Sequence, residues 1–196
     1  YETLAENEAY QLANEKEAYG KGMWAPSFCF HNGTFYITFT SNDLQKTILL
    51  TSQNIEKEWM KSEIEGFFYD GSLFFDDDEK VYMVHGQGVL YVTELERDLS
   101  KAKENGLHRV IVKDQEGIPL GYEGSHLYKK DGFYYLFTCH FLKNSWKTQD
   151  YFVSESLEKE FLGGCLIDDN MDYRKYGVAQ GGIVDTPDGD WYCFMF

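Results

Sequence analysis

Positive charge is scarce in this sequence, and its shortage excludes two classes of partner. Lysine and arginine number 18 against 33 aspartates and glutamates, which gives a net charge of −15. Nucleic-acid backbones and anionic membranes are both bound by clustered cations, so neither is expected as a partner. Long apolar runs are missing too, and none approaches the roughly 18 residues that a membrane span needs.

Cysteines with metal-type spacing and a leader segment are also missing. The four cysteines stand far apart in the chain, so they predict no metal centre. The first eight residues are acidic and contain no apolar core of a signal peptide, which favours a cytoplasmic location.

Aromatic residues and glycine are abundant instead. Tyrosine and phenylalanine number 15 each and tryptophan 4, while glycine reaches 18 and proline stops at 3. Aromatic side chains favour strands and glycines favour the turns between them, so this composition predicts an all-β protein of short strands. Alternating strand and helix patterns are absent, which argues against a parallel α/β fold.

A repeat organises the chain. Four segments align without gaps, and each ends in a tyrosine twelve positions after its first residue. They are residues 24–36, 70–82, 123–135 and 180–192. The turn dipeptides Asn32-Gly33, Asp131-Gly132 and Asp188-Gly189 accept positive φ and predict tight hairpins, while Asp78-Glu79 predicts another turn type.

Further strand-like runs follow the hairpins, at residues 47–51, 89–94, 109–112, 150–154 and 165–167. They give about four strands per unit, and successive units start 46, 53 and 57 residues apart. Four strands in roughly 40–50 residues per repeat are typical of propeller blades. Residues 1–22 are interpreted as a connecting segment, and residues 141–149 and 168–178 as loops.

The first position of the repeat holds the predicted site. In a propeller the first strand of each blade lines the central axis, and the small residues that follow this position avoid crowding there. Equivalent positions project toward the same place, so Trp24, Asp70, Glu123 and Gln180 should converge at one mouth of the axial cavity. Two facing carboxylic acids suit glycoside hydrolysis, in which one protonates the leaving oxygen and the other activates water or tunes the first.

Simpler interpretations stay open for these residues. Asp70 and the glycine after it also fit an ordinary turn, and Trp24 also fits a core position. As binding groups, Trp24 would supply an apolar face for a sugar ring and Gln180 would supply hydrogen bonds. His126 and His140 are the histidines expected near the pocket, and none of the 5 histidines shows the short spacing of a metal site.

These motifs together resemble glycoside hydrolase family 43, most closely its β-xylosidase and α-L-arabinofuranosidase members. The resemblance covers nearly all 196 residues, and the motifs occur in family order. The residues that carry it are Trp-Ala-Pro at 24–26, Asp-Gly-Ser-Leu-Phe-Phe-Asp-Asp-Asp at 70–78, Glu-Gly-Ser-His-Leu-Tyr at 123–128 and Gln-Gly-Gly-Ile-Val-Asp-Thr-Pro at 180–187.

The resemblance implies a five-bladed propeller and hydrolysis with inversion at the anomeric carbon. Glu123 matches the family's general acid, and Asp70 matches the aspartate that raises the pKa of that acid and orients it. Gly71 replaces the proline of the family's Asp-Pro-Ser motif, which is expected to loosen the backbone there. No residue is assigned as the general base, because its motif belongs to a first blade that has no copy in this sequence.

The resemblance also bears on cofactors. Related proteins often hold a cation on the axis through a histidine of the last motif, where this sequence has Gln180. An axial calcium ion is therefore doubtful, and no cofactor is expected to be required.

The length predicts an incomplete ring. Five blades of about 52 residues would need about 260, so 196 residues predict a single partial propeller domain of about three and a half blades. A missing blade or an oligomer partner is expected to cover its open sheet edges. The function implied is hydrolysis of terminal β-xylosyl or α-L-arabinofuranosyl units of hemicellulose. The alternative is a truncated or inactive remnant that at most binds carbohydrate.

Overall fold

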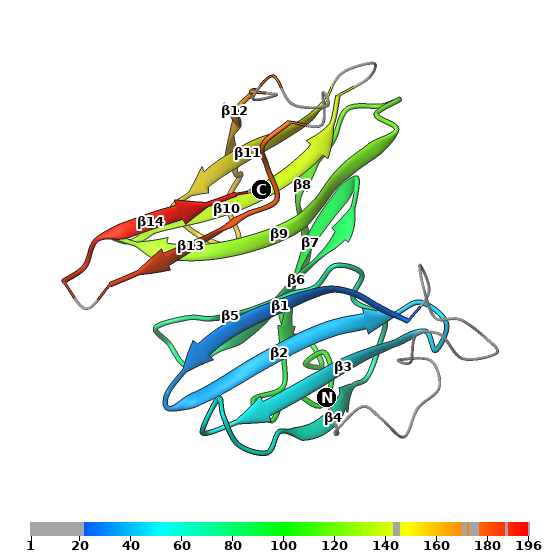
Figure 1. Cartoon of the computed structure of the whole chain (residues 1–196), viewed down its shortest axis with the longest axis vertical. Helices are drawn as coiled ribbons and strands as arrows, with labels where there is room; N and C mark the ends of the chain where they lie inside the picture. Colours follow the sequence, from blue (N-terminus) through cyan, green and yellow to red (C-terminus); the bar gives the residue numbers. More distant parts are fainter. Residues whose placement is uncertain (1–21, 143–145, 170–171, 173–176, 187, 196) are drawn as a thin grey trace. The chain divides into compact units, whose positions relative to one another are not determined.

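A computed structural model describes residues 22–142, 146–169, 172, 177–186 and 188–195, which form strands and turns without a helix (Figure 1). Nothing in these ranges is therefore a helix that could cross a membrane. The predicted connecting segment lies outside them, apart from its last residue. The strands are β1 (Met23–His31), β2 (Thr34–Ser41), β3 (Lys46–Ser52), β4 (Met60–Ile64), β5 (Ser72–Phe75), β6 (Val81–Gln87), β7 (Val89–Leu95), β8 (His108–Lys113), β9 (Leu120–Lys130), β10 (Phe133–Phe141), β11 (Lys147–Ser154), β12 (Leu162–Ile167), β13 (Gly182–Asp185) and β14 (Trp191–Phe194).

Within the described ranges the strands form three four-stranded sheets and one two-stranded sheet. Neighbours in sequence are neighbours in each sheet, in the orders β1-β2-β3-β4, β5-β6-β7-β8, β9-β10-β11-β12 and β13-β14. Each sheet opens with one of the four predicted hairpins, and all four hairpins are antiparallel pairs. The prediction of an all-β chain built of short strands is confirmed.

The four hairpin turns are of two kinds. In the turns at 32–33 and 131–132 both residues have positive φ, as predicted for two-residue turns. The prediction of a two-residue turn at 188–189 is wrong, although Gly189 has the positive φ expected of it. That loop is longer, and it closes where the Thr186 N–H donates to the Asp190 carbonyl at 3.0 Å. The second hairpin closes in the same way, because the Asp76 N–H donates to the Lys80 carbonyl at 2.9 Å.

Two strands differ from the sequence-based expectation. β11 begins at Lys147, so residues 147–149 belong to a strand and not to the predicted loop. These residues form a strand because they pair with β10, where Thr148 lies opposite His140. Such pairing depends on the tertiary structure and leaves no local pattern in the sequence. β4 has no apolar alternation to reveal it, because four of its five residues are exposed.

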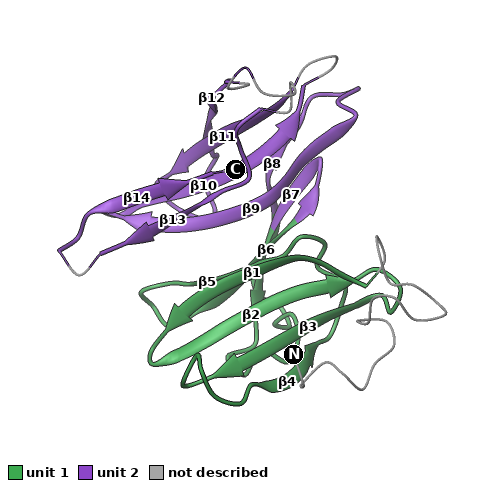
Figure 2. Ribbon diagram, in the orientation of Figure 1, with its two compact units in different colours: residues 1–85, 92–109 green, residues 86–91, 110–196 purple. Residues whose placement is uncertain are grey.

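Internal contacts divide the chain into two compact units (Figure 2). Unit 1 comprises Tyr1–His85 and Val92–Arg109, and unit 2 comprises Gly86–Tyr91 and Val110–Phe196. The boundary runs through the sheet β5-β6-β7-β8, whose β6–β7 turn belongs to unit 2. Of the predicted site residues, Trp24 and Asp70 belong to unit 1 and the rest to unit 2.

An apolar cluster holds unit 1 together. Leu49 of β3, Leu73 of β5, Met83 of β6 and Leu95 of β7 all belong to it, and Met83 is fully buried. Burial of such a side chain is worth about 1.5–3 kcal/mol relative to exposure. The cluster therefore anchors β5 and the turn in front of it, which carries Asp70.

Beside this cluster, two histidines share one threonine hydroxyl. The Thr93 oxygen lies 2.8 Å from His85 Nε2 and 2.8 Å from His108 Nδ1. A hydroxyl has one donor and two acceptor sites, so it can hydrogen-bond both rings at once. Burial, followed by the nearby His108, lowers the pKa of His85 to about 4.

Acid should destabilise unit 1 through His85. The unfolded chain takes up a proton near pH 6.5 but the folded chain only near pH 4, so stability present above pH 6.5 is lost as the pH falls toward 4. Up to about 3 kcal/mol of unfolding free energy should disappear. Urea unfolding at pH 7, 5.5 and 4 should show a shallower loss for His85→Gln than for the wild type, and parallel losses would contradict this assignment.

Unit 2 contains the sheet β9-β10-β11-β12 and the last hairpin. The hairpin is attached through Tyr128 of β9, whose hydroxyl accepts a hydrogen bond from the Ile183 N–H at 2.8 Å. The Tyr128 ring also meets Trp191 edge-on at 6.1 Å. β13 is thereby fixed against β9, which places Gln180, just before β13, near the start of β9.

Candidate active site

The four first-position residues adopt two backbone conformations. Trp24 and Glu123 lie within strands β1 and β9, and the residue after each has positive φ. Asp70 and Gln180 precede their strands and have positive φ themselves, 51° and 57°. The repeat had implied that the four positions are equivalent, but their backbone conformations differ. The reason is that β1 and β9 extend past the repeat position through irregular pairing.

Unit 1 presents two of the predicted site residues. Asp70 is 8 % exposed and lies in the turn between β4 and β5, and Trp24 is 36 % exposed and pairs with Thr40 across β1 and β2. Because these two residues and the other four lie in different units, the convergence of the four side chains on one mouth stays a prediction.

Gly71 is held firmly, which corrects the expectation of a loosened backbone. Its N–H donates to the Phe68 carbonyl at 3.0 Å, a hydrogen bond that the family's proline could not make. A Cβ atom at this position would lie 2.7 Å from Met83 Sδ and 2.8 Å from the Phe68 carbonyl oxygen. Glycine therefore fixes the turn of Asp70 by close packing and a backbone hydrogen bond.

A methyl group at Gly71 should destabilise the protein. In Gly71→Ala the added methyl group would push against both the Met83 side chain and the Phe68 carbonyl. We therefore expect a loss of about 1–3 kcal/mol in unfolding free energy. Gly164→Ala is the matched control, because a Cβ there meets nothing within 4 Å. Urea denaturation should separate the two variants, and equal stability would refute the close packing at Gly71.

In unit 2, Glu123 is brought together with two amide side chains. Glu123 is 8 % exposed, and its carboxylate accepts a hydrogen bond from Gln87 Nε2 at 3.3 Å. Its carbonyl accepts one from the Thr138 hydroxyl at 2.8 Å. Gln180 lies beside the next residue, Gly124, where a Cβ would stand 3.4 Å from Gln180 Cγ. The buried acid thus lies in a polar setting.

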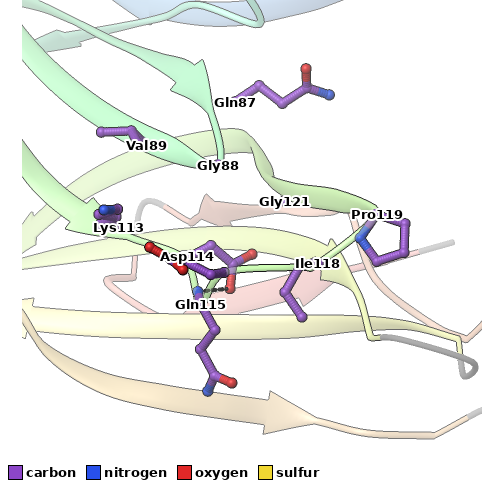
Figure 3. A pocket seen from close by; sticks show the side chains of 10 residues that line it. Gln87, Gly88, Val89, Lys113, Asp114, Gln115, Ile118, Pro119 and Gly121 are labelled. Carbon is purple, nitrogen blue, oxygen red and sulfur yellow. Dashed lines mark hydrogen bonds between the residues drawn. The ribbon is translucent and has the colours of Figure 1, made fainter.

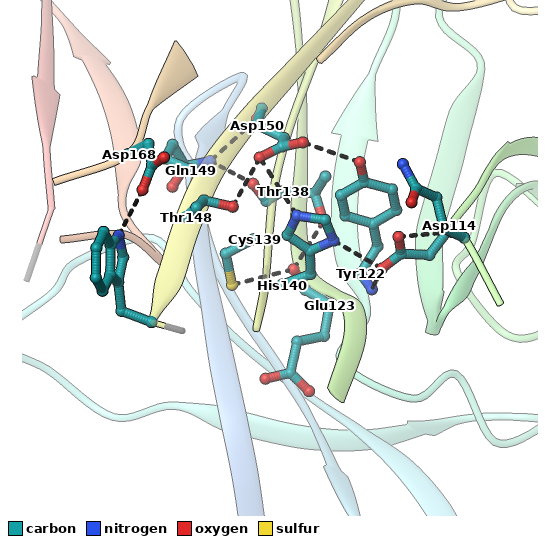
Figure 4. A network of polar contacts seen from close by, with 12 residues as sticks. Asp114, Tyr122, Glu123, Thr138, Cys139, His140, Thr148, Gln149, Asp150 and Asp168 are labelled. Atoms are coloured by element: carbon teal, nitrogen blue, oxygen red, sulfur yellow. Dashed lines mark hydrogen bonds and ion pairs between the residues drawn. The ribbon is translucent and has the colours of Figure 1, made fainter. Parts of the chain in front are cut away.

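His140 follows Cys139, the residue of β10 that pairs with Glu123, and it lies between two carboxylates (Figure 4). Its Nδ1 is 2.8 Å from Asp114 Oδ2, and its Nε2 is 3.8 Å from Asp150 Oδ1. A carboxylate only accepts hydrogen bonds, so Nδ1 carries a hydrogen. Figure 4 shows the Glu123 carboxylate pointing away from the His140 ring, whose nitrogens face the two aspartates.

Tyr122 completes this network and is held at three points. Its N–H donates to Asp114 Oδ2 at 3.0 Å, its hydroxyl donates to Asp150 Oδ2 at 2.9 Å, and its ring stacks on His140 at 4.4 Å. Burial raises the pKa of Tyr122, and the Asp150 and Asp114 carboxylates raise it further, so the hydroxyl stays protonated as a donor. Because Tyr122 directly precedes Glu123, the network also fixes the backbone of Glu123.

His126 lies apart from this network. It stands three residues beyond Glu123 on β9, opposite Phe137, and its ring stacks near Tyr128 at 6.4 Å. Burial lowers the pKa of His126, so the ring is neutral at pH 7. Its ring contact is with Tyr128 rather than with the Asp114 network, and its predicted contact with a substrate stays a prediction.

An open groove of about 330 Å³ adjoins the network in unit 2 (Figure 3). Gln87, Lys113, Asp114, Ile118 and Pro119 are among its lining residues. Gln87 therefore borders the groove and also contacts Glu123. Over the described ranges, no three His, Cys, Asp or Glu side chains gather in a way that could hold a metal ion.

Sequence reasoning missed several residues of this site. Gln87, Asp114, Tyr122 and Asp150 carry no motif, and each is joined to its partner by pairing between distant strands. One signal was available, since residues 147–150 are polar and lead directly into a strand-like run. Polar residues that enter a strand and are buried need partners, so such a run can indicate a buried network.

Removing the Tyr122 hydroxyl should weaken the network. Tyr122→Phe leaves Asp150 Oδ2 without this donor in a buried place, and we expect a loss of about 1–3 kcal/mol in unfolding free energy. Tyr192→Phe is the control, because Tyr192 is 57 % exposed. Thermal and urea unfolding should show the loss in the first variant alone, and an unchanged stability of Tyr122→Phe would contradict the network's role.

Comparison with known proteins agrees with this architecture. The family model "Glycosyl hydrolases family 43" matches residues 3–196. A xylosidase/arabinosidase of Butyrivibrio fibrisolvens is 30% identical over 89% of this chain and 38% of its own length. A putative β-xylosidase of Xylanibacter ruminicola is 25% identical over 91% of this chain. The chain spans about a third of the length of these relatives, 38% and 34%.

Solved structures extend the agreement to the fold. A bifunctional GH43-CE protein of Bacteroides eggerthii superposes with a TM-score of 0.83 at 32% identity, over 97% of this chain and 24% of that chain. A xylan β-1,4-xylosidase of Bacillus halodurans gives a TM-score of 0.72 at 25% identity, over 89% of this chain and 37% of that chain. The all-β sheets are part of a five-bladed β-propeller, as predicted. The chain belongs to the glycosyl hydrolases of family 43.

Proposed function

We propose that the protein carrying this chain hydrolyses terminal β-xylosyl or α-L-arabinofuranosyl linkages of hemicellulose, with inversion at the anomeric carbon. The observation that carries the proposal is the buried Glu123 carboxyl, hydrogen-bonded by Gln87 and held on a braced strand of a family-43 chain. The names of the relatives, a xylosidase/arabinosidase and a putative β-xylosidase, support the class of sugar.

The proposed chemistry assigns the proton transfer to Glu123. Its carboxyl group gives a proton to the glycosidic oxygen as the bond to the anomeric carbon breaks, while water attacks that carbon from the opposite face. Asp70 is assigned the role of keeping the acid protonated and oriented, and Trp24, Gln180, His126 and His140 the role of contacting the sugar. A carboxylate outside these residues takes the proton of the attacking water.

The proposal includes no axial calcium ion and no other cofactor. The family resemblance sets Gln180 against the histidine that often holds a cation in related proteins, and here the Gln180 amide oxygen accepts a hydrogen bond from the Lys147 ammonium group. A cationic donor already fills the place where a metal ion would need a ligand, so this donor set does not suit calcium.

We also propose that further strands or a second subunit cover the last hairpin. In the described ranges β13 and β14 form a sheet of two strands, whereas the other sheets have four. Val184, Tyr192 and Phe194 on this hairpin are each more than half exposed, at 52%, 57% and 57%. Open sheet edges with exposed apolar side chains are sites of strand pairing.

Glu123→Gln tests the proposed function. It keeps the shape of the side chain but removes the acidic proton, so we expect cleavage of a xylobiose or arabinofuranosyl substrate to fall by about 10²–10⁴-fold. Glu158→Gln, at an exposed turn of the same unit, should leave the rate unchanged.

The same experiment tests the alternative of an inactive remnant. If the wild type binds xylo-oligosaccharides but releases no sugar, or if Glu123→Gln cleaves as fast as the wild type, the enzyme proposal is refuted. Product release can be followed by chromatography of the freed monosaccharide, and binding by calorimetry.

A further inference from the structure

The turn between β6 and β7 presents one side chain to Glu123. Gln87 lies at this turn between two glycines, Gly86 with a φ of 123° and Gly88 with a φ of 70°. Such backbone angles are open to glycine and costly for other residues, so the flanking glycines allow the sharp reversal that exposes the Gln87 carboxamide.

The turn is fastened to the strand that carries Glu123. The Gly88 N–H donates to the Tyr122 carbonyl at 2.8 Å, and the Gly88 carbonyl accepts from the Asp114 N–H at 2.7 Å. A Cβ atom on Gly121 would lie 2.6 Å from Gly88 Cα, so the two backbones are in direct contact. Figure 3 shows Gly88 and Gly121 on neighbouring segments, with Asp114 nearby. Gln87 is therefore held in place relative to Glu123, and all these residues belong to unit 2.

The direction of the contact between the side chains determines where an acid proton can reside. Gln87 Nε2 donates to Glu123 Oε2 at 3.3 Å. The lone pair of an amide nitrogen is delocalised into the carbonyl group, so Nε2 only donates, and while it faces Glu123 the oxygen opposite it acts as the acceptor. The proton of the neutral acid then resides on the other oxygen, Oε1.

We propose that Gln87 is a positioning residue that confines the acid proton of Glu123 to Oε1. After proton transfer, its hydrogen bond to Oε2 stabilises the carboxylate. This inference rests on the proposed function. In the step, the Oε1–H bond breaks and its proton bonds to the glycosidic oxygen. The electron pair of the breaking carbon–oxygen bond stays with that oxygen, while water bonds to the anomeric carbon and gives its proton to a carboxylate base.

A leaving-group comparison separates this role from a purely structural one. Sugar leaving groups need the proton, whereas dinitrophenolate leaves without it. Gln87→Met keeps the length of the side chain and removes the donor. We expect it to lower kcat roughly tenfold on xylobiose and less than about twofold on 2,4-dinitrophenyl β-xyloside, the same pattern as Glu123→Gln but weaker. Equal losses on both substrates, or no loss on xylobiose, would overturn the inference.

Gln53→Met is the matched control, because it makes the same chemical change at an exposed position after β3 and should alter neither rate. If Gln87→Met retains full activity on both substrates while Glu123→Gln loses activity on xylobiose, the inference fails and the proposed function stands. If Glu123→Gln loses nothing, the proposed function itself fails.

An NMR measurement that does not depend on activity tests the contact between Gln87 and Glu123 directly. In the ¹⁵N-labelled protein, the side-chain amide signal of Gln87 is assigned by its loss in Gln87→Met. It should move by more than its linewidth in Glu123→Met, while the Gln53 signal stays in place. An unmoved Gln87 signal would refute the contact on which the inference depends.

Discussion

The placement of His140 between Asp114 and Asp150 is the constraint on which the site in unit 2 depends. A buried carboxylate is costly unless it is paired and hydrogen-bonded, so these two aspartates can be buried only where donors meet them. The donors come from β9 and β10, through Tyr122 and His140. The network therefore ties together three strands and the end of β8, and any shift in their register would leave a buried charge without its partner.

This constraint passes directly to Glu123 through the backbone. Tyr122 is fixed by its N–H, its hydroxyl and its ring, and Glu123 follows it in the chain. The same Tyr122 carbonyl accepts the hydrogen bond of Gly88, which brings Gln87 to the Glu123 carboxylate. A polar network of this kind adds less stability than an apolar core of equal size, but it holds side chains in one arrangement. Here that arrangement orients an acid.

Much of the fold could be predicted from the sequence, and less of the site. The four hairpins follow from local turn residues and strand patterns, which act over a dozen residues. The repeat also placed Glu123 on a strand, where the structure has it. It implied, however, that Trp24 and Asp70 share one conformation, whereas Trp24 lies in a strand and Asp70 has positive φ before one. The start of β11 was missed because polar residues gave no alternation to read.

The sequence by itself determined the hairpins, the repeat and the family, and it made Glu123 the candidate acid, because these depend on residues close together in the chain or on motifs in a set order. Only the tertiary structure decided which groups surround Glu123. Gln87 reaches the Glu123 carboxylate from outside the β9-β10-β11-β12 sheet, while Asp114 and Asp150 bind the neighbouring Tyr122, and no local pattern records such pairing. Their partners are chosen by the register between strands, and that register is settled by the packing of the whole unit.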